Sequence, residues 1–408
     1  MKQWAAGAAR QARVLVLIGA AVFLAACGGG GGGGAPPAVP ATTNAAATVP
    51  VAANVLQVTL DRGIDNSAIN APFVTVRVCQ PGTATCVDID HVLLDTGSNG
   101  LLLAASALPA GFDLPQVTDA GGVAIGECSR FASGFAWGSV RRADVGLAGD
   151  MAVGIPVQVV NDRQAPFAAI PAACSNGIPN LGVGAGSRGI LGVGLFAQDC
   201  GSACETSDRP NVYFSCTAAG CASTRVPIAS QVINPVAALP VNNNGVVLVL
   251  PPVPASGLSG ATGSLLLGIG TQANNAVTNA TVYTTSALGF VSVQYRGTTY
   301  PASFLDSGSN GNFVNDPTLP RCGDFYCPAS QVTRSATLVG ANGATAAIDF
   351  QVDNVAALAP GAAVANLAGP SGSARAIDFG LPFFFGRTVY VARAGASTPA
   401  GPGPYWAF

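Results

Sequence analysis

Short apolar runs alternate with turn-forming residues along most of the chain from Val51 onward. The runs at 55–61 (VLQVTLD), 73–79 (FVTVRVC) and 387–393 (RTVYVAR) are rich in β-branched residues, and glycine, proline, asparagine or aspartate separates such runs. This pattern is typical of β-strands. Long segments with helical periodicity are scarce, and only 105–112 (ASALPAGF) suits one or two helical turns. The sequence therefore predicts a mainly β fold.

The composition is consistent with a large and mostly uncharged core. Of 408 residues, 49% are hydrophobic and 9% are charged, and the net charge is −2. A chain of this length normally forms more than one compact unit, so we expect two large lobes. Nucleic-acid-binding proteins usually carry a basic stripe, whereas Lys2 is the single lysine of this chain. We therefore expect no nucleic-acid partner.

The first 27 residues have the order of parts found in an export signal. Lys2, Arg10 and Arg13 form a basic start, and the apolar stretch 14–26 (VLVLIGAAVFLAA) follows it. This stretch has the length of a signal-peptide core and is short for a membrane-spanning helix. We interpret residues 1–27 as a signal peptide.

The end of this segment, LAAC, resembles the lipobox of bacterial lipoproteins, with its cysteine at Cys27. The resemblance implies that Cys27 is lipidated, so that the membrane is a partner, and that Gly28 directs the protein to the outer membrane of the cell envelope. An ordinary signal peptide with a chance cysteine is the alternative. The Gly- and Pro-rich segment 28–50 has no apolar periodicity and is expected to be a flexible tether.

The rest of the chain is expected to form an N-terminal lobe, 51–260, and a C-terminal lobe, 261–408. The stretch 240–245 (PVNNNG) does not suit a strand. We place the boundary between the lobes somewhere between Asn242 and Asn279.

Ten cysteines remain besides Cys27, and an even number in an exported chain suggests disulfides. Four pairs are close in sequence and elimination leaves a fifth: Cys79/Cys86, Cys200/Cys204, Cys216/Cys221, Cys322/Cys327 and Cys128/Cys174. Sequence spacing alone does not prove this connectivity. A zinc site is the competing interpretation, and it is disfavoured because no CxxC spacing occurs and His91 is the only histidine.

One short acidic turn occurs twice in the sequence, as LDTGSNG at 94–100 and as LDSGSNG at 305–311. Each copy follows an apolar strand, so that Asp95 and Asp306 stand at strand ends. A single turn of this kind is common and usually structural. Two copies after matching strands indicate an internal duplication with a shared function.

The residues after each aspartate can surround it with hydrogen-bond donors. Gly97 and Gly308 can adopt backbone angles that place an N–H group against a carboxylate. Ser98 and Ser309 can each donate a hydroxyl hydrogen bond to the same acid. A carboxylate with several donors keeps its charge easily.

Bringing two such turns together changes the chemistry of both acids. Two carboxylates a few ångströms apart cannot both ionise, so they share one proton and titrate as a unit. One acid can then accept a proton from a water while the other donates a proton to a substrate carbonyl. This arrangement hydrolyses amides without a metal, a cofactor or a covalent intermediate, so we expect neither metal nor cofactor.

The duplicated motif resembles that of the pepsin-like aspartic peptidases. In that family two β-rich lobes, each a β-barrel, contribute one Asp-Thr/Ser-Gly motif to a central cleft that binds a peptide or protein substrate. The resemblance implies that Asp95 and Asp306 are catalytic and that Thr96 and Ser307 lock the two loops together. It also implies that the outer hydrogen bonds to the acids come from Ser98 and Ser309.

Further segments match the family more loosely. Ile190-Leu191-Gly192 resembles the hydrophobic-hydrophobic-Gly element beneath the first loop, and 378–393 resembles the second such element with its following strand. The segment 131–134 (FASG) falls where the family has its flap, a hairpin over the substrate. This places Phe131, Ser133 and, in the same hairpin, Trp137 beside the substrate.

The sequence departs from the family pattern at several positions. Phe131 stands where the flap usually has a tyrosine, and Leu102 stands where the tryptophan bonded to that tyrosine is common. Asp378 begins the second hydrophobic-hydrophobic-Gly element, and a buried aspartate there needs a partner. No lysine or arginine occurs between residue 28 and Arg62, so a basic pro-segment is not expected.

Two functions of different classes follow from these observations. The first is a lipid-anchored aspartic endopeptidase in the bacterial cell envelope. The second, suggested by the altered flap, is a catalytically inactive lipoprotein that uses the same fold for binding or structure. A serine hydrolase would have to use His91, which lies four residues before Asp95 without a nucleophile motif nearby, and is disfavoured. We expect His91 to flank the site or to be structural.

Overall fold

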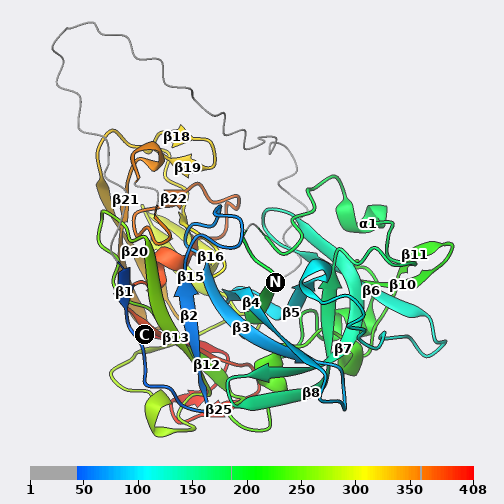
Figure 1. Ribbon diagram of the computed structural model, residues 1–408. Helices are drawn as coiled ribbons and strands as arrows, with labels where there is room; N and C mark the ends of the chain where they lie inside the picture. Colours follow the sequence, from blue (N-terminus) through cyan, green and yellow to red (C-terminus); the bar gives the residue numbers. More distant parts are fainter. Residues whose placement is uncertain (1–43, 185, 359–360) are drawn as a thin grey trace, which may run out of the picture.

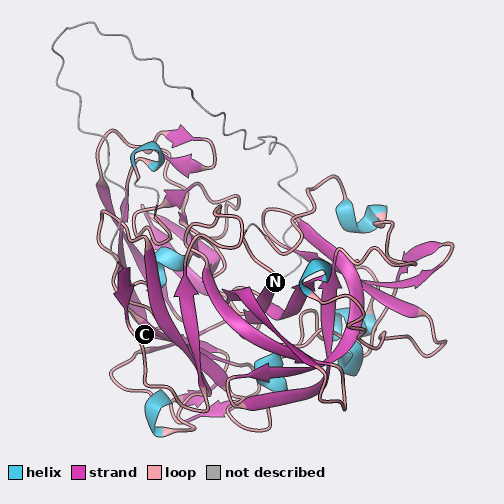
Figure 2. Ribbon diagram, in the orientation of Figure 1, coloured by secondary structure: helices cyan, strands magenta, loops and turns pink. Residues whose placement is uncertain are grey.

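The computed structural model describes residues 44–184, 186–358 and 361–408 of the protein. Strands dominate the described chain and its helices are short, as Figure 2 shows. The prediction of a mainly β fold is confirmed. Residues 1–43, which include Cys27 and most of the expected tether, lie outside the described residues.

One large sheet contains both early and late parts of the chain. Its strand order is β11-β10-β6-β7-β8-β5-β9-β4-β3-β2-β13-β12-β24-β27-β14, with β1 paired to β13. The strand bounds are β1 Asn44–Ala46, β2 Val55–Leu60, β3 Pro72–Cys79, β4 Cys86–Asp95, β5 Asn99–Ala104, β6 Ala124–Arg130, β7 Phe135–Leu147, β8 Asp150–Val160, β9 Gly189–Val193, β10 Tyr213–Thr217, β11 Gly220–Ser223, β12 Gly245–Val249, β13 Gly260–Leu267, β14 Val282–Thr284, β24 Thr388–Ala392 and β27 Tyr405–Ala407.

A second sheet of seven strands surrounds the second copy of the acidic turn. Its order is β21-β20-β15-β16-β23-β17-β22, and two further pairs, β18-β19 and β25-β26, stand outside it. The bounds are β15 Val291–Tyr295, β16 Thr298–Leu305, β17 Asn312–Phe313, β18 Arg321–Cys322, β19 Phe325–Tyr326, β20 Val332–Val339, β21 Thr345–Val352, β22 Ala368–Gly369, β23 Asp378–Phe379, β25 Ser397–Thr398 and β26 Gly401–Pro402.

Helical segments only connect the strands. The bounds are α1 Ala172–Ser175, α2 Ser202–Thr206 and α3 Leu381–Phe384, with 3₁₀ turns at η1 Ala105–Ala107, η2 Ile228–Ser230, η3 Pro235–Ala238, η4 Ala273–Asn275 and η5 Val355–Ala357. The helical turn expected within 105–112 is therefore present as η1. None of the helices in the described residues is long and apolar enough to cross a membrane.

The same strand arrangement surrounds each copy of the acidic turn. In the first half, β9 runs parallel to β4 and antiparallel to β5, and β5 runs parallel to β8. In the second half, β23 runs parallel to β16 and antiparallel to β17, and β17 runs parallel to β22. The duplication seen in seven residues of sequence therefore extends to the topology, with one barrel-like sheet around each copy. The fold is the two-sheet β arrangement that the resemblance implied.

The two halves are joined through the large sheet. Strand β2 pairs antiparallel with β13 along its length, and Figure 1 shows the blue β2 beside the green β13. The lobe boundary expected at 260/261 falls at the first residue of β13, and the division into two lobes stays a prediction. A single apolar cluster contains residues of both sheets, among them Leu94 and Leu305, which precede the two acids. Burial of this shared core stabilises both acidic turns together.

All ten cysteines of the body are joined as the spacing suggested. The five disulfides are Cys79–Cys86, Cys128–Cys174, Cys200–Cys204, Cys216–Cys221 and Cys322–Cys327. Sulfur atoms bonded to each other are not thiolate ligands, so these cysteines do not form the competing zinc site.

Asn70 links the two halves close to the second acidic turn, which the sequence analysis did not anticipate. Its side-chain amide donates to the carbonyls of Asn310, at 2.7 Å, and Val364, at 2.8 Å, and its oxygen accepts from the Val364 amide at 2.7 Å. The residue is 1% exposed and has a left-handed backbone, with φ of 54°. Both hydrogen-bonding ends of the side chain are therefore used within the protein.

Replacing Asn70 with alanine should destabilise the protein by roughly 2–5 kcal/mol, because buried backbone groups lose their partners. Asn279→Ala is a matched control, since Asn279 is exposed and has φ of 55°. Both variants place alanine in a left-handed backbone, which costs about the same free energy in each. The difference between their losses in unfolding free energy therefore measures the contribution of the buried hydrogen bonds of Asn70. Urea unfolding measures both, and equal losses in the two variants would contradict the assigned role of Asn70.

Candidate active site

The two acidic turns are bonded to each other by a symmetric set of hydrogen bonds. The Thr96 amide donates to Ser307 Oγ at 3.1 Å, and the Ser307 amide donates to Thr96 Oγ1 at 2.9 Å. The same hydroxyls donate onward, from Thr96 to the Leu305 carbonyl at 3.3 Å and from Ser307 to the Leu94 carbonyl at 2.7 Å. Thr96 and Ser307 are both fully buried, so water does not compete for these bonds.

Each turn places its glycine against the aspartate of the other turn. A Cβ atom on Gly97 would lie 2.5 Å from Asp306 Cγ, and a Cβ atom on Gly308 would lie 2.8 Å from Asp95 Cγ. Real Cβ atoms do not approach other atoms this closely, so a side chain at either position would push the acids apart. The structure thus brings together Asp95 and Asp306, which are near enough to hydrogen-bond to each other.

The first acid is held by donors from its own turn. The Gly97 amide donates to Asp95 Oδ1 at 2.7 Å, and Ser98 Oγ donates to Asp95 Oδ2 at 2.5 Å. Asp95 is 6% exposed. These two donors fix the plane of the Asp95 carboxyl group.

The second acid has equivalent donors but a different electrostatic state. The Gly308 amide donates to Asp306 Oδ1 at 2.8 Å, and Ser309 Oγ lies 2.9 Å from Asp306 Oδ2. Burial, followed by the negative charges of Asp95 and Asp378, raises the pKa of Asp306 well above its usual value. Asp306 therefore retains its proton to higher pH than an isolated aspartate does.

Asp378 is a third carboxyl group at this site. Its Oδ2 lies 2.7 Å from Ser309 Oγ, which identifies the partner that the sequence analysis could not name. Burial is the main cause that raises the pKa of Asp378 to about 8. The signal for this residue was its place two positions before Gly380, in the second hydrophobic-hydrophobic-Gly element.

The first such element occupies the equivalent place in the other half. Ile190, Leu191 and Gly192 lie in β9, between β4 and β5, with Gly192 opposite Asp95 in the register. A Cβ on Gly192 would lie 2.8 Å from Ser98 Oγ, so this glycine leaves room for the serine that bonds the first acid.

The segment expected to be the flap lies in the hairpin of β6 and β7, and its role as a flap stays a prediction. The Phe131 amide donates to the Gly134 carbonyl at 2.8 Å across the turn, and Ser133 is exposed at its tip. Phe131 packs against an apolar cluster that includes Leu102 and Ile190. The two positions that departed from the family pattern therefore lie in one apolar cluster. A role for Phe131 and Ser133 in substrate binding stays a prediction.

Trp137 lies in β7 of this hairpin, and its side chain is buried in the core. Its indole is 2% exposed, donates to the Phe167 carbonyl at 2.9 Å and contacts Phe214 edge to face at 5.3 Å. The side chain is thus committed to internal contacts, and the structure does not bring it together with the acid pair.

His91 faces Asp61 and not the acid pair. Its Nε2 lies 3.2 Å from Asp61 Oδ2, and its ring lies 5.2 Å from that of Phe73. A β-bulge in the pairing of β3 with β4 adjoins His91, which has φ of 51°. The His91 ring contacts Asp61, Asp90 and Phe73, so His91 is structural in this arrangement.

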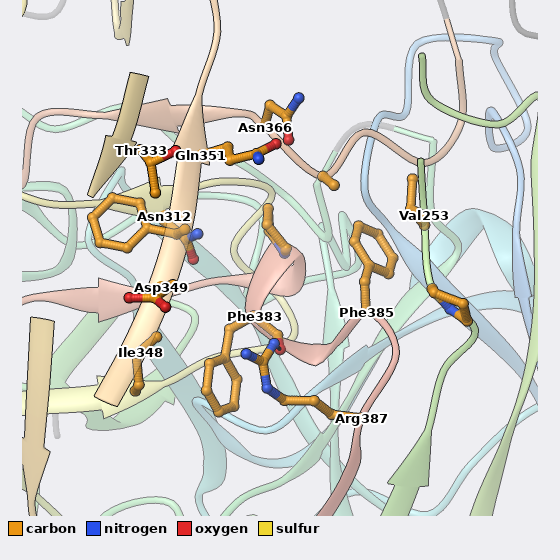
Figure 3. Close-up of a pocket in the computed structure, with 14 residues that line it drawn as sticks. Val253, Asn312, Thr333, Ile348, Asp349, Gln351, Asn366, Phe383, Phe385 and Arg387 are labelled. Atoms are coloured by element: carbon orange, nitrogen blue, oxygen red, sulfur yellow. Dashed lines mark hydrogen bonds between the residues drawn. The ribbon is translucent and has the colours of Figure 1, made fainter. Parts of the chain in front are cut away.

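A separate pocket of about 280 Å³ lies in the second sheet, between the β20–β21 hairpin and α3. Figure 3 shows Phe383 and Arg387 along one side and Asn312 along another. Among the described residues that line it there is neither Asp95 nor Asp306. The pocket therefore does not hold the acid pair. The described residues also contain no cluster of three or more histidine, cysteine or acidic side chains suited to a metal ion.

The raised pKa of Asp306 predicts how stability depends on pH. The folded protein retains this proton above pH 3.8, where the unfolded chain loses it, so the contribution of Asp306 is complete below pH 3.8 and declines as pH rises. Asp306→Asn should therefore have nearly wild-type thermal stability at low pH and a growing advantage toward neutral pH, which calorimetry can measure.

Asp316 provides a control of opposite sign. Burial alone would raise its pKa, but hydrogen bonds from Thr318 and Arg334 outweigh burial and lower the pKa of Asp316. Its stabilisation is present above pH 3.8 and declines as pH falls, so Asp316→Asn should lose stability at neutral pH. An Asp306→Asn variant that loses stability with rising pH, as the control does, would contradict the assigned proton.

Comparison with known proteins gives a family but no established activity. A search of curated proteins found no match to this sequence. One solved structure similar to this chain is described as "Crystal structure of aspartic proteinase from Irpex lacteus", with 14% sequence identity and a TM-score of 0.46, covering 87% of this chain and 96% of that chain. A sequence family matches residues 50–408, which is most of the chain, and the protein therefore belongs to the family described as "Protein of unknown function (DUF3443)".

Proposed function

We propose that this protein is an aspartic endopeptidase that is anchored to a membrane by a lipid at Cys27. The observation that carries the proposal is the contact between Asp95 and Asp306, which come from turns 211 residues apart and are locked together through buried hydroxyls. A buried pair of carboxyls is costly to assemble, because each raises the energy of ionising the other. Each carboxyl is held by a glycine amide and a serine hydroxyl. Acid–base catalysis requires groups that are positioned in this way.

The proposed reaction uses a water placed between the two carboxyls. Asp95 accepts a proton from this water as the water oxygen attacks the carbonyl carbon of the peptide bond. Asp306 donates its proton to the carbonyl oxygen, which gives a tetrahedral diol. Asp95 then gives its proton to the amide nitrogen while one diol hydroxyl returns a proton to Asp306, and the C–N bond breaks to give an acid and an amine. Each proton that leaves one carboxyl is replaced, so the pair ends in its starting state.

A binding protein without catalysis is the second candidate. The observation that favours it is the apolar cluster of Phe131 and Leu102, which has no hydroxyl or indole N–H at the flap. Such a flap can cover a bound peptide but cannot orient it through those polar groups. The acid pair would then bind a peptide or a hydroxyl-containing inhibitor without turnover.

Substituting either acid should abolish cleavage under this proposal. Asp95→Asn and Asp306→Asn each remove a proton-transfer group, so we expect kcat to fall by at least about 10²–10⁴-fold. Hydrolysis of a denatured protein, followed from acidic to neutral pH, measures the loss. Asp208→Asn makes the same chemical change at an exposed aspartate and should leave the rate unchanged.

Two results would contradict the peptidase proposal. Cleavage that persists in Asp95→Asn or Asp306→Asn would exclude the acid pair as its source. A wild-type protein that binds a peptide inhibitor with a transition-state-like hydroxyl but cleaves nothing would favour the binding protein.

The lipid anchor is a proposal from the LAAC segment alone. Replacing Cys27 with serine removes the thiol that would carry the lipid and changes no residue of the two expected lobes. We expect the wild-type protein to incorporate a labelled fatty acid and to sediment with membranes when expressed in a Gram-negative bacterium. The Cys27→Ser variant should do neither, and equal labelling of both proteins would exclude this anchor.

A further inference from the structure

Ser309 stands between two carboxyl groups but has one proton to donate. Its Oγ lies 2.9 Å from Asp306 Oδ2 and 2.7 Å from Asp378 Oδ2. A hydroxyl donates one hydrogen bond and accepts others. Both contacts can be hydrogen bonds only if one of the two carboxyls is protonated and donates to Ser309. If Asp378 is that donor, the Ser309 proton is directed to Asp306.

The second oxygen of Asp378 also favours a protonated acid. Asp378 Oδ1 is buried and has no hydrogen-bond partner among the described residues. An ionised carboxylate with one oxygen in this position would lack the donors that stabilise its charge, whereas the carbonyl of a neutral acid needs fewer. The titratable groups that act on Asp378 are acids, Asp95 by its charge and Asp306 through Ser309, and the paired strands β16 and β17 contribute no Asp, Glu, Lys, Arg or His.

The first half of the protein shows what this site is like without a third acid. Asp378 is opposite Phe304, two residues before Asp306, and Ile190 is opposite Leu93, two residues before Asp95. Ile190 is therefore the equivalent of Asp378. Ser98 has one carboxyl partner, Asp95, so its proton has one direction. The competition at Ser309 exists in the second half only.

We propose that Asp378 is a positioning residue of the acid pair: as a neutral acid it donates to Ser309 and so directs the Ser309 proton to Asp306, and its ionisation sets the alkaline limit of activity. The inference rests on the proposed function for its catalytic part, but the protonation of Asp378 is a property of the protein whether or not it cleaves peptides.

Ionisation of Asp378 would reverse the hydrogen bond at Ser309. A charged carboxylate is a stronger acceptor than a neutral acid, so Ser309 turns its proton from Asp306 to Asp378. Asp306 then loses the outer donor that orients it. Burial raises the pKa of Asp378 to about 8, and the charge formed when Asp378 ionises raises the pKa of Asp306. Ionisation of Asp378 therefore removes the outer donor of Asp306 and at the same time opposes loss of the Asp306 proton.

The test compares the pH dependence of kcat in the full chain for the wild type, Asp378→Asn and Asp378→Ile. Asparagine retains a donor to Ser309 and cannot ionise, so the alkaline midpoint of kcat should move up by about one pH unit or more, with KM unchanged at acidic pH. Isoleucine reproduces the first half of the protein and removes both the donor and the charge. Ser309 then has Asp306 as its one carboxyl partner, as Ser98 has Asp95, so we expect the same upward shift of the midpoint with kcat at acidic pH close to that of the wild type.

A merely electrostatic effect of Asp378 gives the opposite result. Removing a negative charge beside Asp306 would lower the pKa of Asp306, and the alkaline midpoint would move down. A midpoint of Asp378→Asn that is unchanged or lower therefore overturns the proposal. Asp208→Asn, at an exposed position, should leave the midpoint where it is in the wild type. If Asp378→Ile fails to fold, the asparagine variant alone decides between these outcomes.

Infrared spectroscopy provides a measurement that does not depend on cleavage. The difference between the wild type and Asp378→Asn at neutral pH should contain the C=O band of a protonated carboxyl, and this band should disappear as pH rises above about 8. A carboxylate band at neutral pH would overturn the proposal even in an active enzyme. A protonated band in a protein that cleaves nothing would reject the peptidase function while supporting the state assigned to Asp378.

Discussion

The reciprocal hydrogen bonds between Thr96 and Ser307 are the interaction on which the site depends. Each hydroxyl accepts a hydrogen bond from a backbone amide of the other turn. Each also donates to a backbone carbonyl in the strand that precedes that other turn. The bonds fix the distance between two backbones, not between two flexible side chains, so the acids inherit their separation from the strands. Gly97 and Gly308 then permit the contact that these bonds impose.

Placing two buried carboxyl groups in contact is unfavourable in free energy, and the surrounding structure offsets this. Asp95 and Asp306 each have two donors from their own turns, and burial and two neighbouring acids oppose the ionisation of Asp306. A shared apolar core and the continuous pairing of β2 with β13 hold the halves together against this unfavourable term. The contact between the two carboxyl groups thus lowers stability and also perturbs their pKa values, as is common at functional sites.

Local features of the fold and the site were predictable from sequence, and features that depend on register were not. Apolar alternation predicted the strands, cysteine spacing the disulfides, and the repeated turn the pair of acids. The bulge beside His91 could not be predicted, because the residue pattern of a strand does not show where its pairing with the next strand shifts by one residue. The partner of Asp378 and the bridge made by Asn70 both join segments far apart in the chain, and strand pairing alone brings them together.

The difference between Ile190 and Asp378 shows what a covalent link between the halves makes available. Each half supplies one acid and one side of the lock, so two identical chains related by a two-fold axis could in principle assemble the same centre. Such a homodimer would carry aspartate at both equivalent positions or at neither, because one gene would encode both. A fused duplication removes that restriction, and the two halves of this protein have diverged at this register position, where one has a hydrocarbon side chain and the other a carboxyl group.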